Sequence, residues 1–265
     1  MGKTAAIVFT DLDGTLLDHH SYAFTAAIPA LELLKAHAIP VILASSKTAA
    51  EIASLRDKMG LSAYPAIVEN GAGVLPAQAH PQTILSQDYP KIRAALAAMP
   101  APLRRHFTGF GDMSIPETAT ETGLPPADAA LAKERVFSEP GTWHGDDAAL
   151  SEFLAYLAGQ GISARQGGRY LTLSFGKTKA DQMAQIRAQY GAPPVIALGD
   201  APNDLEMLMA ADYPVLIRNP KARPLPGLTD DQRARLLYST RPGPQGWNEM
   251  VPPIIRSLTS PNTGA

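Results

Sequence analysis

The sequence predicts an α/β fold, in which a core built on a parallel β-sheet is split by an inserted α+β domain. Two observations support this prediction. Strand-like and helix-like segments alternate near both ends of the chain, and this alternation is lost between about residues 78 and 169. Alternating strands and helices are typical of a parallel sheet with helices on both faces.

The first part of the predicted core begins with a short apolar run at residues 5–9, which is typical of a buried strand. Apolar residues at helical spacing predict a helix over residues 24–37. The run "IPVILASS" predicts the next strand, and residues 48–59 a second helix that ends at Gly60, a common residue after helix ends. The run "AIVENGAG" then predicts a strand that leads into a turn.

The inserted segment combines helices and short strands between loops rich in Gly, Pro and Thr. We expect helices at residues 89–99, 126–135 and 146–158, and strands at residues 135–138 and 170–175. The core pattern then returns with a helix at 178–190, the strand "PVIALGD", a helix at 203–211 and the strand "PVLIR". We therefore expect a core formed by residues 1–82 and 172–265, and an inserted domain at residues 83–171.

Composition excludes several functional classes. The chain has 265 residues, is 45% hydrophobic, and carries 23 basic and 25 acidic residues for a net charge of −2. Because there are no cysteines, disulfides and thiolate chemistry are excluded. Without a block of like charge or a long apolar run, we expect neither a nucleic-acid partner nor a membrane segment, and a cytoplasmic location. The oligomeric state is not predicted.

Polar residues follow several of the predicted strands. An ordinary turn would also explain the Asp-Gly pair in "DLDGT". However, the carboxyl ends of parallel strands share one edge of a sheet, where open α/β folds hold their sites. The residues gathered there would be Asp11, Asp13, Ser45, Ser46, Lys177, Lys179, Asp200, Asn203 and Asp204.

This set of side chains predicts a magnesium site that handles a phosphoryl group. Several carboxylates in one cleft cannot all stay ionised unless a cation lies among them. Oxygen ligands without His or Cys favour Mg²⁺. A lysine and a serine hydroxyl suit phosphoryl oxygens. Together these parts suffice for phosphoryl transfer through an aspartyl-phosphate.

The motifs "DLDGT", a serine at the second strand end, a lysine before a helix and "GDAPND" occur in the order found in the haloacid dehalogenase (HAD) superfamily, which the chain resembles. The resemblance implies a Rossmann-like core, Mg²⁺-dependent phosphatase activity, and an α+β cap inserted between the serine and lysine motifs. The "ENGAG" segment, with Asn70, is similar to the subgroup with this cap.

The resemblance also implies roles for single residues. Asp11 would be the nucleophile, and Asp13 would protonate the leaving oxygen and then activate water. Asp11, the Asp13 carbonyl and Asp200 would hold Mg²⁺, while Ser45 and Lys177 would hold the phosphoryl oxygens. Ser46 and Lys179 are open alternatives for the last two. Supporting roles would fall to Thr15, Ser46, Asn70, Asn203 and Asp204.

The inserted segment suggests the substrate. "GFGDM", "ETGLP" and "RVFSEP" resemble the mannosyl-3-phosphoglycerate phosphatases. The resemblance implies hydrolysis of mannosyl-3-phosphoglycerate to mannosylglycerate and phosphate. We expect Arg135 or Arg169 to meet the glycerate carboxylate, and Asp112 or Glu117 to meet sugar hydroxyls, although any one arginine is more often a surface charge.

Other functions remain open at this point. The chain could hydrolyse another sugar phosphate, such as glucosyl-3-phosphoglycerate or a hexose phosphate. It could be a sugar phosphomutase, which returns the phosphoryl group to a sugar. It could also be a non-catalytic regulator that binds phosphosugars, but every catalytic position is filled.

Overall fold

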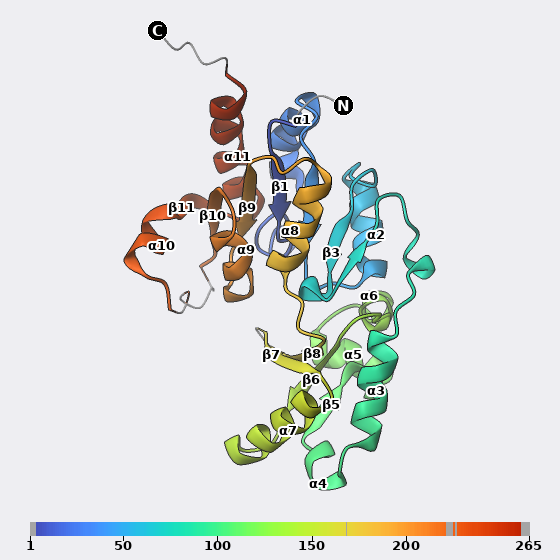
Figure 1. Ribbon diagram of the computed structural model, residues 1–265. Helices are drawn as coiled ribbons and strands as arrows, with labels where there is room; N and C mark the ends of the chain where they lie inside the picture. Colours follow the sequence, from blue (N-terminus) through green and yellow to red (C-terminus); the bar gives the residue numbers. More distant parts are fainter. Residues whose placement is uncertain (1–3, 168, 221–224, 226, 261–265) are drawn as a thin grey trace. The chain divides into compact units, whose positions relative to one another are not determined.

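A computed structural model describes residues 4–167, 169–220, 225 and 227–260 of the chain. The chain divides into two compact units (Figure 1). The first unit comprises Met1–Ser45, Ala63–Ile67 and Lys179–Ala265, and the second comprises Ser46–Ser62 and Val68–Thr178.

The larger sheet is built mainly from parallel strands. Its members are β1 (Ile7–Thr10), β2 (Val41–Ala44), β3 (Ala66–Val68), β4 (Gly73–Leu75), β9 (Val195–Gly199), β10 (Tyr213–Arg218) and β11 (Leu237–Pro242). They follow the order β11-β10-β9-β1-β2-β3-β4. β1 pairs in parallel with β2 and β9, and β10 does so with β9 and β11. The prediction of an α/β fold with a parallel-sheet core is confirmed.

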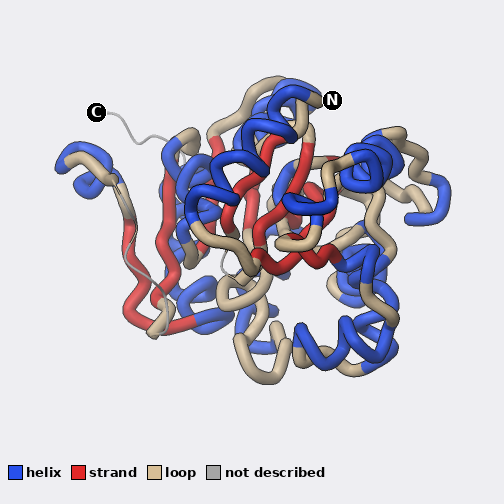
Figure 2. The backbone as a smooth tube through the Cα atoms, turned by 90° about the horizontal axis from the view of Figure 1, so that it is seen from below, coloured by secondary structure: helices blue, strands red, loops and turns tan. Residues whose placement is uncertain are grey.

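The central strands are apolar because both faces of the sheet are covered. Every residue of β1, β2 and β9 is buried, as is usual for parallel strands between helices. The helices of this unit are α1 (Ile28–Ala36), α8 (Lys179–Gln189), α9 (Leu205–Met209), α10 (Asp230–Arg235) and α11 (Gly243–Thr259). α1 packs against α11, and α8 against α9. Figure 2 shows the strands (red) side by side with helices (blue) along them.

The second unit contains an antiparallel sheet with the order β5-β6-β8-β7. Its strands are β5 (Phe107–Gly109), β6 (Glu139–Trp143), β7 (Ser163–Gln166) and β8 (Leu171–Ser174). Its helices are α2 (Ala49–Lys58), α3 (Asp88–Ala98), α4 (Ala101–Arg104), α5 (Ile115–Thr122), α6 (Pro126–Lys133) and α7 (Asp147–Gly159). Side chains from α3, α7 and the sheet form its apolar core, including Ile92, Leu96, Phe107, Phe153, Leu157 and Leu173.

The second unit is larger than the predicted insertion at residues 83–171, because it also takes in α2 and β4. α2 is tied to this unit at both ends. At its start, the Thr48 hydroxyl donates to the Leu131 carbonyl at 2.9 Å. At its end, the buried Arg56 guanidinium donates to the carbonyls of Pro76 and Ala79, at 2.8 and 3.1 Å.

The predicted strand at residues 135–138 is wrong. The strand β6 begins only at Glu139. The preceding backbone is occupied elsewhere, because the N–H groups of Val136, Phe137 and Ser138 all donate to the buried Glu69 carboxylate, at 2.8–3.2 Å. A segment whose amides converge on one carboxylate cannot also offer them to a neighbouring strand.

Candidate functional site

Two aspartates meet at the carboxyl end of the larger sheet. β1 and β9 pair in register, with Thr10 opposite Leu198, and the Asp11 amide donates to the Leu198 carbonyl at 2.9 Å. Asp11 directly follows β1 and Asp200 directly follows β9, so strand pairing alone brings them to one edge. Both are buried, with 7% and 4% of their surface exposed.

Lys179 is the cation of this site. It is the first residue of α8 and is only 2% exposed. Its Nζ donates to Asp11 Oδ1 at 2.6 Å and to Asp204 Oδ1 at 2.8 Å. The other oxygen of the fully buried Asp204 accepts from the backbone N–H groups of Asp200 and Ala201, both at 3.2 Å. Asp204 therefore anchors both Lys179 and the backbone at Asp200.

The loop after Asp11 is folded against Asp200. Thr15 Oγ1 donates to Asp200 Oδ1 at 2.9 Å. Gly14 has φ +84°, and a Cβ there would lie 2.7 Å from Asp200 Oδ2. Glycine is therefore required here both for the backbone conformation and for the close approach. The half-buried Asp13 lies at the start of this turn.

The side chains influence one another's protonation strongly. Burial, together with the nearby Asp204 charge, raises the pKa of Asp11, although Lys179 opposes this shift. Burial and Asp204 also raise the pKa of Asp200, to about 6. Burial alone would lower the pKa of Lys179, but Asp11 and Asp204 raise it. The cluster thus holds one charged ammonium, and its neighbouring carboxylates do not all ionise readily at the same time.

The residues present fit a magnesium ion. One carboxylate oxygen from each of Asp11, Asp200 and Asp204 lies within 4.8 Å of the others. Three buried carboxylates around one ammonium have an excess of negative charge, which a divalent cation would neutralise. The donors are all hard oxygens, which suit Mg²⁺.

Ser45 joins the same sheet edge, whereas Ser46 does not. β2 pairs in parallel with β1, with Leu43 opposite Thr10. Ser45 follows β2, is 1% exposed, and donates its N–H to the Ile67 carbonyl at 3.0 Å. Ser46 is exposed and belongs to the second unit. The structure therefore favours Ser45 between the two alternatives.

The two predicted supporting asparagines lie in different surroundings. Asn203 is exposed, in the turn Pro202–Asp204 that precedes α9. Asn70 lies in the second unit, is half-buried, and has a left-handed φ of 58°. A supporting role for each stays a prediction.

Of the two candidate lysines, the structure brings Lys179 to Asp11. Lys177 is exposed and belongs to the second unit, whereas Lys179 lies beside Asp11, and its role toward a phosphoryl group stays a prediction. The difference between the two lysines comes from the start of α8. The helix begins at Lys179, so the lysine at its first position, and not the one two residues earlier, is held at the edge of the sheet.

The predicted sugar-binding acids have partners within the second unit. Asp112 accepts from Arg93 at 2.7 Å and from Arg104 at 2.6 Å. Glu117 accepts from the backbone N–H and the hydroxyl of Ser114, both at 2.7 Å, and this pair forms the capping box of α5. Both acids therefore have structural roles, and their contact with a sugar stays a prediction.

The two predicted arginines are also held locally. The Arg135 side chain is 5% exposed and pairs with Glu69 at 3.3 Å. Arg169 donates to the carbonyls of Glu121 and Thr122, at 3.3 and 3.2 Å, and lies over the Tyr170 ring. Arg169 remains exposed, so it is better placed than Arg135 to bind an anion from solvent.

Two neighbours of the site were not predicted from the sequence. Asn219 follows β10, and its Nδ2 donates to Asp200 Oδ2 at 2.6 Å. The fully buried Trp247 of α11 donates Nε1 to the Thr10 hydroxyl at 3.0 Å, directly before Asp11. Neither lies in a recognisable motif, and only the position of Asn219 after the strand "PVLIR" could have indicated it.

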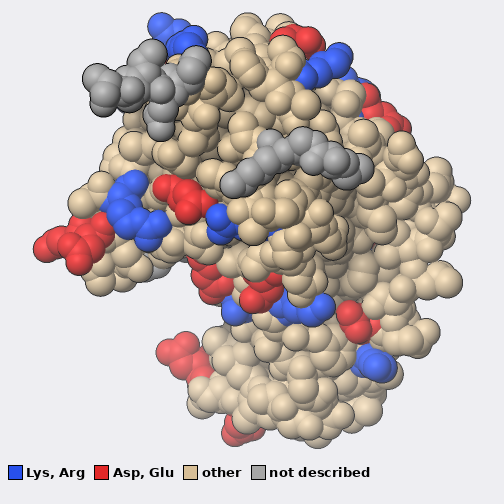
Figure 3. Space-filling model, turned by 45° about the horizontal axis from the view of Figure 1, so that its top comes forward, with Lys and Arg blue, Asp and Glu red and all other residues tan. Residues whose placement is uncertain are grey.

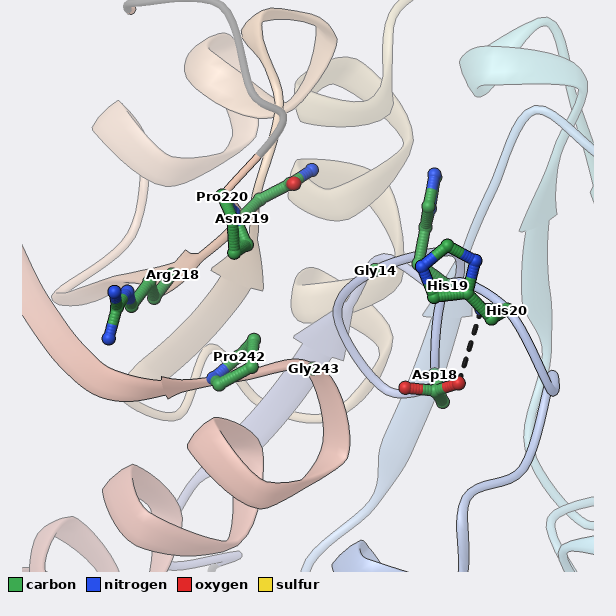
Figure 4. A pocket seen from close by; sticks show the side chains of 9 residues that line it. All are labelled: Gly14, Asp18, His19, His20, Arg218, Asn219, Pro220, Pro242 and Gly243. Carbon is green, nitrogen blue, oxygen red and sulfur yellow. Dashed lines mark hydrogen bonds between the residues drawn. The ribbon is translucent and has the colours of Figure 1, made fainter.

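A pocket of about 140 Å³ adjoins the site in the first unit. Gly14 and Asn219, which both lie close to Asp200, line it together with His19, His20 and Pro242 (Figure 4). On the face shown in Figure 3, the acidic and basic side chains of the described residues are interspersed, with no broad area of one sign. Among the described residues, no helix is both long and apolar enough to cross a membrane.

Comparisons with known proteins agree with this geometry. Residues 8–98 match the model of a family described as haloacid dehalogenase-like hydrolase. The chain is 33% identical to a protein of Methanococcoides burtonii named glucosyl-3-phosphoglycerate/mannosyl-3-phosphoglycerate phosphatase, over 94% of this chain and 97% of that protein.

Solved structures share the fold. A protein from Geobacillus kaustophilus has a TM-score of 0.65 at 20% identity, covering 97% of this chain and all of that one. A HAD superfamily phosphatase from Bacteroides thetaiotaomicron has a TM-score of 0.64 at 17% identity, covering 95% and 94% of the two chains. The chain therefore belongs to the haloacid dehalogenase-like hydrolases, as a phosphoric monoester hydrolase.

Proposed function

We propose that the chain is a Mg²⁺-dependent phosphatase that hydrolyses mannosyl-3-phosphoglycerate to mannosylglycerate and phosphate. The observation that supports this most is the buried Asp11, held at 2.6 Å by Lys179 and close to Asp200 and Asp204. The Asp11 carboxylate is held in place at the end of a strand, and the Lys179 ammonium lies beside it. A nucleophile that attacks a phosphoryl group requires both a fixed position and a neighbouring positive charge.

The proposed reaction has two steps. An oxygen of Asp11 attacks phosphorus, and the bond between phosphorus and the ester oxygen of mannosylglycerate breaks. Asp13 gives that leaving oxygen a proton. Asp13 then takes a proton from water, the water oxygen attacks phosphorus, and the Asp11–phosphorus bond breaks to release phosphate. Asp13 serves first as acid and then as base, so both residues are regenerated.

The remaining residues hold charge in place. The Lys179 ammonium favours the ionised form of Asp11, against burial and its acidic neighbours. Ser45 and Lys179 would bind phosphoryl oxygens. Asp11, the Asp13 carbonyl and Asp200 would hold Mg²⁺, which supplies neutralising charge to the phosphoryl group when bound.

Glucosyl-3-phosphoglycerate is the second candidate substrate, because the name of the Methanococcoides burtonii relative includes both sugars. The two substrates share the phosphoglycerate portion and differ in the sugar. The sugar would be recognised by the second unit, for which Asp112, Glu117, Arg135 and Arg169 are our candidates. We also propose a cytoplasmic location, which suits a phosphorylated sugar as partner.

A substrate panel tests this proposal. The purified chain is assayed for released phosphate with mannosyl-3-phosphoglycerate, glucosyl-3-phosphoglycerate, a hexose phosphate and p-nitrophenyl phosphate, each with Mg²⁺ and with excess chelator. We expect Mg²⁺-dependent release that is fastest with the mannosyl substrate. An isomerised sugar phosphate without free phosphate would indicate a mutase instead. No turnover of any ester would contradict the proposal.

A further inference from the structure

Both oxygens of the Asp200 carboxylate are held by side-chain donors. Thr15 Oγ1 donates to Oδ1 at 2.9 Å, and Asn219 Nδ2 donates to Oδ2 at 2.6 Å. The two donors come from different places, Thr15 from the turn after β1 and Asn219 from the end of β10. A carboxylate held at both oxygens cannot rotate freely about its terminal bond.

We propose that Asn219 is a positioning residue for the divalent cation, acting through Asp200. A carboxylate offers about four lone-pair sites, two on each oxygen. One donor at each oxygen leaves lone pairs for a metal, while the plane of the group stays fixed. This inference rests on the proposed Mg²⁺ dependence, and it assigns part of the metal affinity to a residue outside the "GDAPND" motif.

The backbone before Asn219 is itself well anchored. β10 pairs with β9, with Leu216 opposite Gly199, so the chain segments that follow these residues leave the sheet side by side. The Arg218 N–H donates to Ser239 Oγ at 2.9 Å, and the Arg218 guanidinium donates to the Thr240 carbonyl at 3.1 Å. The neighbouring strand β11 thus fixes the position of Arg218, the residue directly before Asn219.

A neutral amide is well suited to this position. Lys179 already contacts Asp11 and Asp204. A second ammonium at Asp200 would repel an incoming divalent cation, whereas an amide N–H orders the carboxylate without adding charge. Partners of metal ligands typically contribute 10- to 100-fold to metal affinity, and we expect an effect of this size for Asn219.

The test measures Mg²⁺ binding directly, without substrate. Isothermal titration calorimetry with MgCl₂ is run on the wild-type chain, Asn219→Ala, Asn219→Leu and the control Asn248→Ala. Asn248 is half-buried in the same unit and accepts from the Ala30 N–H at 3.0 Å. Its substitution also removes one hydrogen bond, but none to Asp200.

We expect both Asn219 variants to bind Mg²⁺ about 10- to 100-fold more weakly, and Asn248→Ala to bind like the wild type. In the enzyme assay, the Mg²⁺ concentration for half-activation should rise while kcat at saturating Mg²⁺ is largely kept. A merely structural role would instead lower kcat at every Mg²⁺ concentration.

The outcomes separate the two proposals. If a folded Asn219 variant binds Mg²⁺ as tightly as the wild type, the role of Asn219 is refuted and the proposed function stands. If the wild-type chain itself shows no Mg²⁺ binding, the metal-dependent function fails first. Alanine and leucine at position 219 differ in size, so the test can be read from one variant if the other does not fold.

Discussion

Substituting Lys179 with methionine probes the centre of the site. The change keeps the length and apolar stem of the side chain but removes the ammonium that bonds to Asp11 and Asp204 at 2.6 and 2.8 Å. Both carboxylates are then left buried without their cation. The matched control is Lys177→Met, because Lys177 is exposed two residues earlier.

The size of the effect follows from burial. Removing one partner of a buried ion pair costs about 3–5 kcal/mol, since the other charge stays desolvated. Here one ammonium serves two carboxylates, so we expect the upper end of that range. For a chain of this size, each kcal/mol lowers Tm by about 2–4 °C, so the upper end, about 5 kcal/mol, gives a loss of about 10–20 °C for Lys179→Met. A surface change such as Lys177→Met should stay within about 0.5 kcal/mol.

The assay combines calorimetric unfolding in the metal-free state with phosphatase turnover. Lys179→Met should lose several orders of magnitude in turnover, and Lys177→Met should remain close to the wild type. Burial raises the pKa of Asp11 above its unfolded value, so a proton binds more tightly to the folded state and the stability loss should shrink as the pH falls. A stable, active Lys179→Met protein, or an equal loss in Lys177→Met, would refute the assignment.

Three further predictions concern the other groups. Asp11→Asn keeps the shape of the side chain but removes the attacking charge, so turnover should fall by orders of magnitude while circular dichroism and Tm remain close to wild type; near-normal turnover would exclude Asp11 as nucleophile. Burial raises the pKa of Asp200 to about 6, above its unfolded value of about 3.9, so the metal-free protein should gain stability as the pH falls from 7 through 6, and protons should compete with Mg²⁺. Calorimetric Mg²⁺ affinity should therefore be weaker at pH 5 than at pH 7.5, and equal affinities would contradict this. Glu117→Gln keeps the capping box of α5 but removes the charge. Slower turnover of mannosyl-3-phosphoglycerate with unchanged turnover of p-nitrophenyl phosphate would support sugar contact. Wild-type turnover of both substrates would leave Glu117 only its capping role.

The central fold could be predicted because its pattern is local. The runs at β1, β2 and β9 are buried along their whole length and, apart from Thr10, apolar, and they alternate with helix-like segments. Parallel pairing then requires Asp11, Ser45 and Asp200 to emerge at one edge. For these three residues, strand position in the sequence was enough to place the site.

Elements that depend on distant partners could not be predicted. α11 contains Pro252 and Pro253, which oppose an interior helix by local rules, yet its apolar face, with the fully buried Trp247, packs on α1 and β10. The segment at residues 135–138 has the composition of a strand, but the carboxylate of Glu69 takes its amides. In both cases tertiary contacts outweigh local preference.

The sequence by itself therefore determined the parallel-sheet core, the aspartates at its edge and the kind of chemistry they support, because strand ends and carboxylates can be read one residue at a time. Only the tertiary structure decided that Lys179 rather than Lys177 meets Asp11, and that Asn219 meets Asp200. The first depends on the residue at which α8 begins, and the second on where β10 ends beside β9. A shift of one or two residues at an element boundary moves a side chain by several ångströms, which local sequence preferences do not resolve.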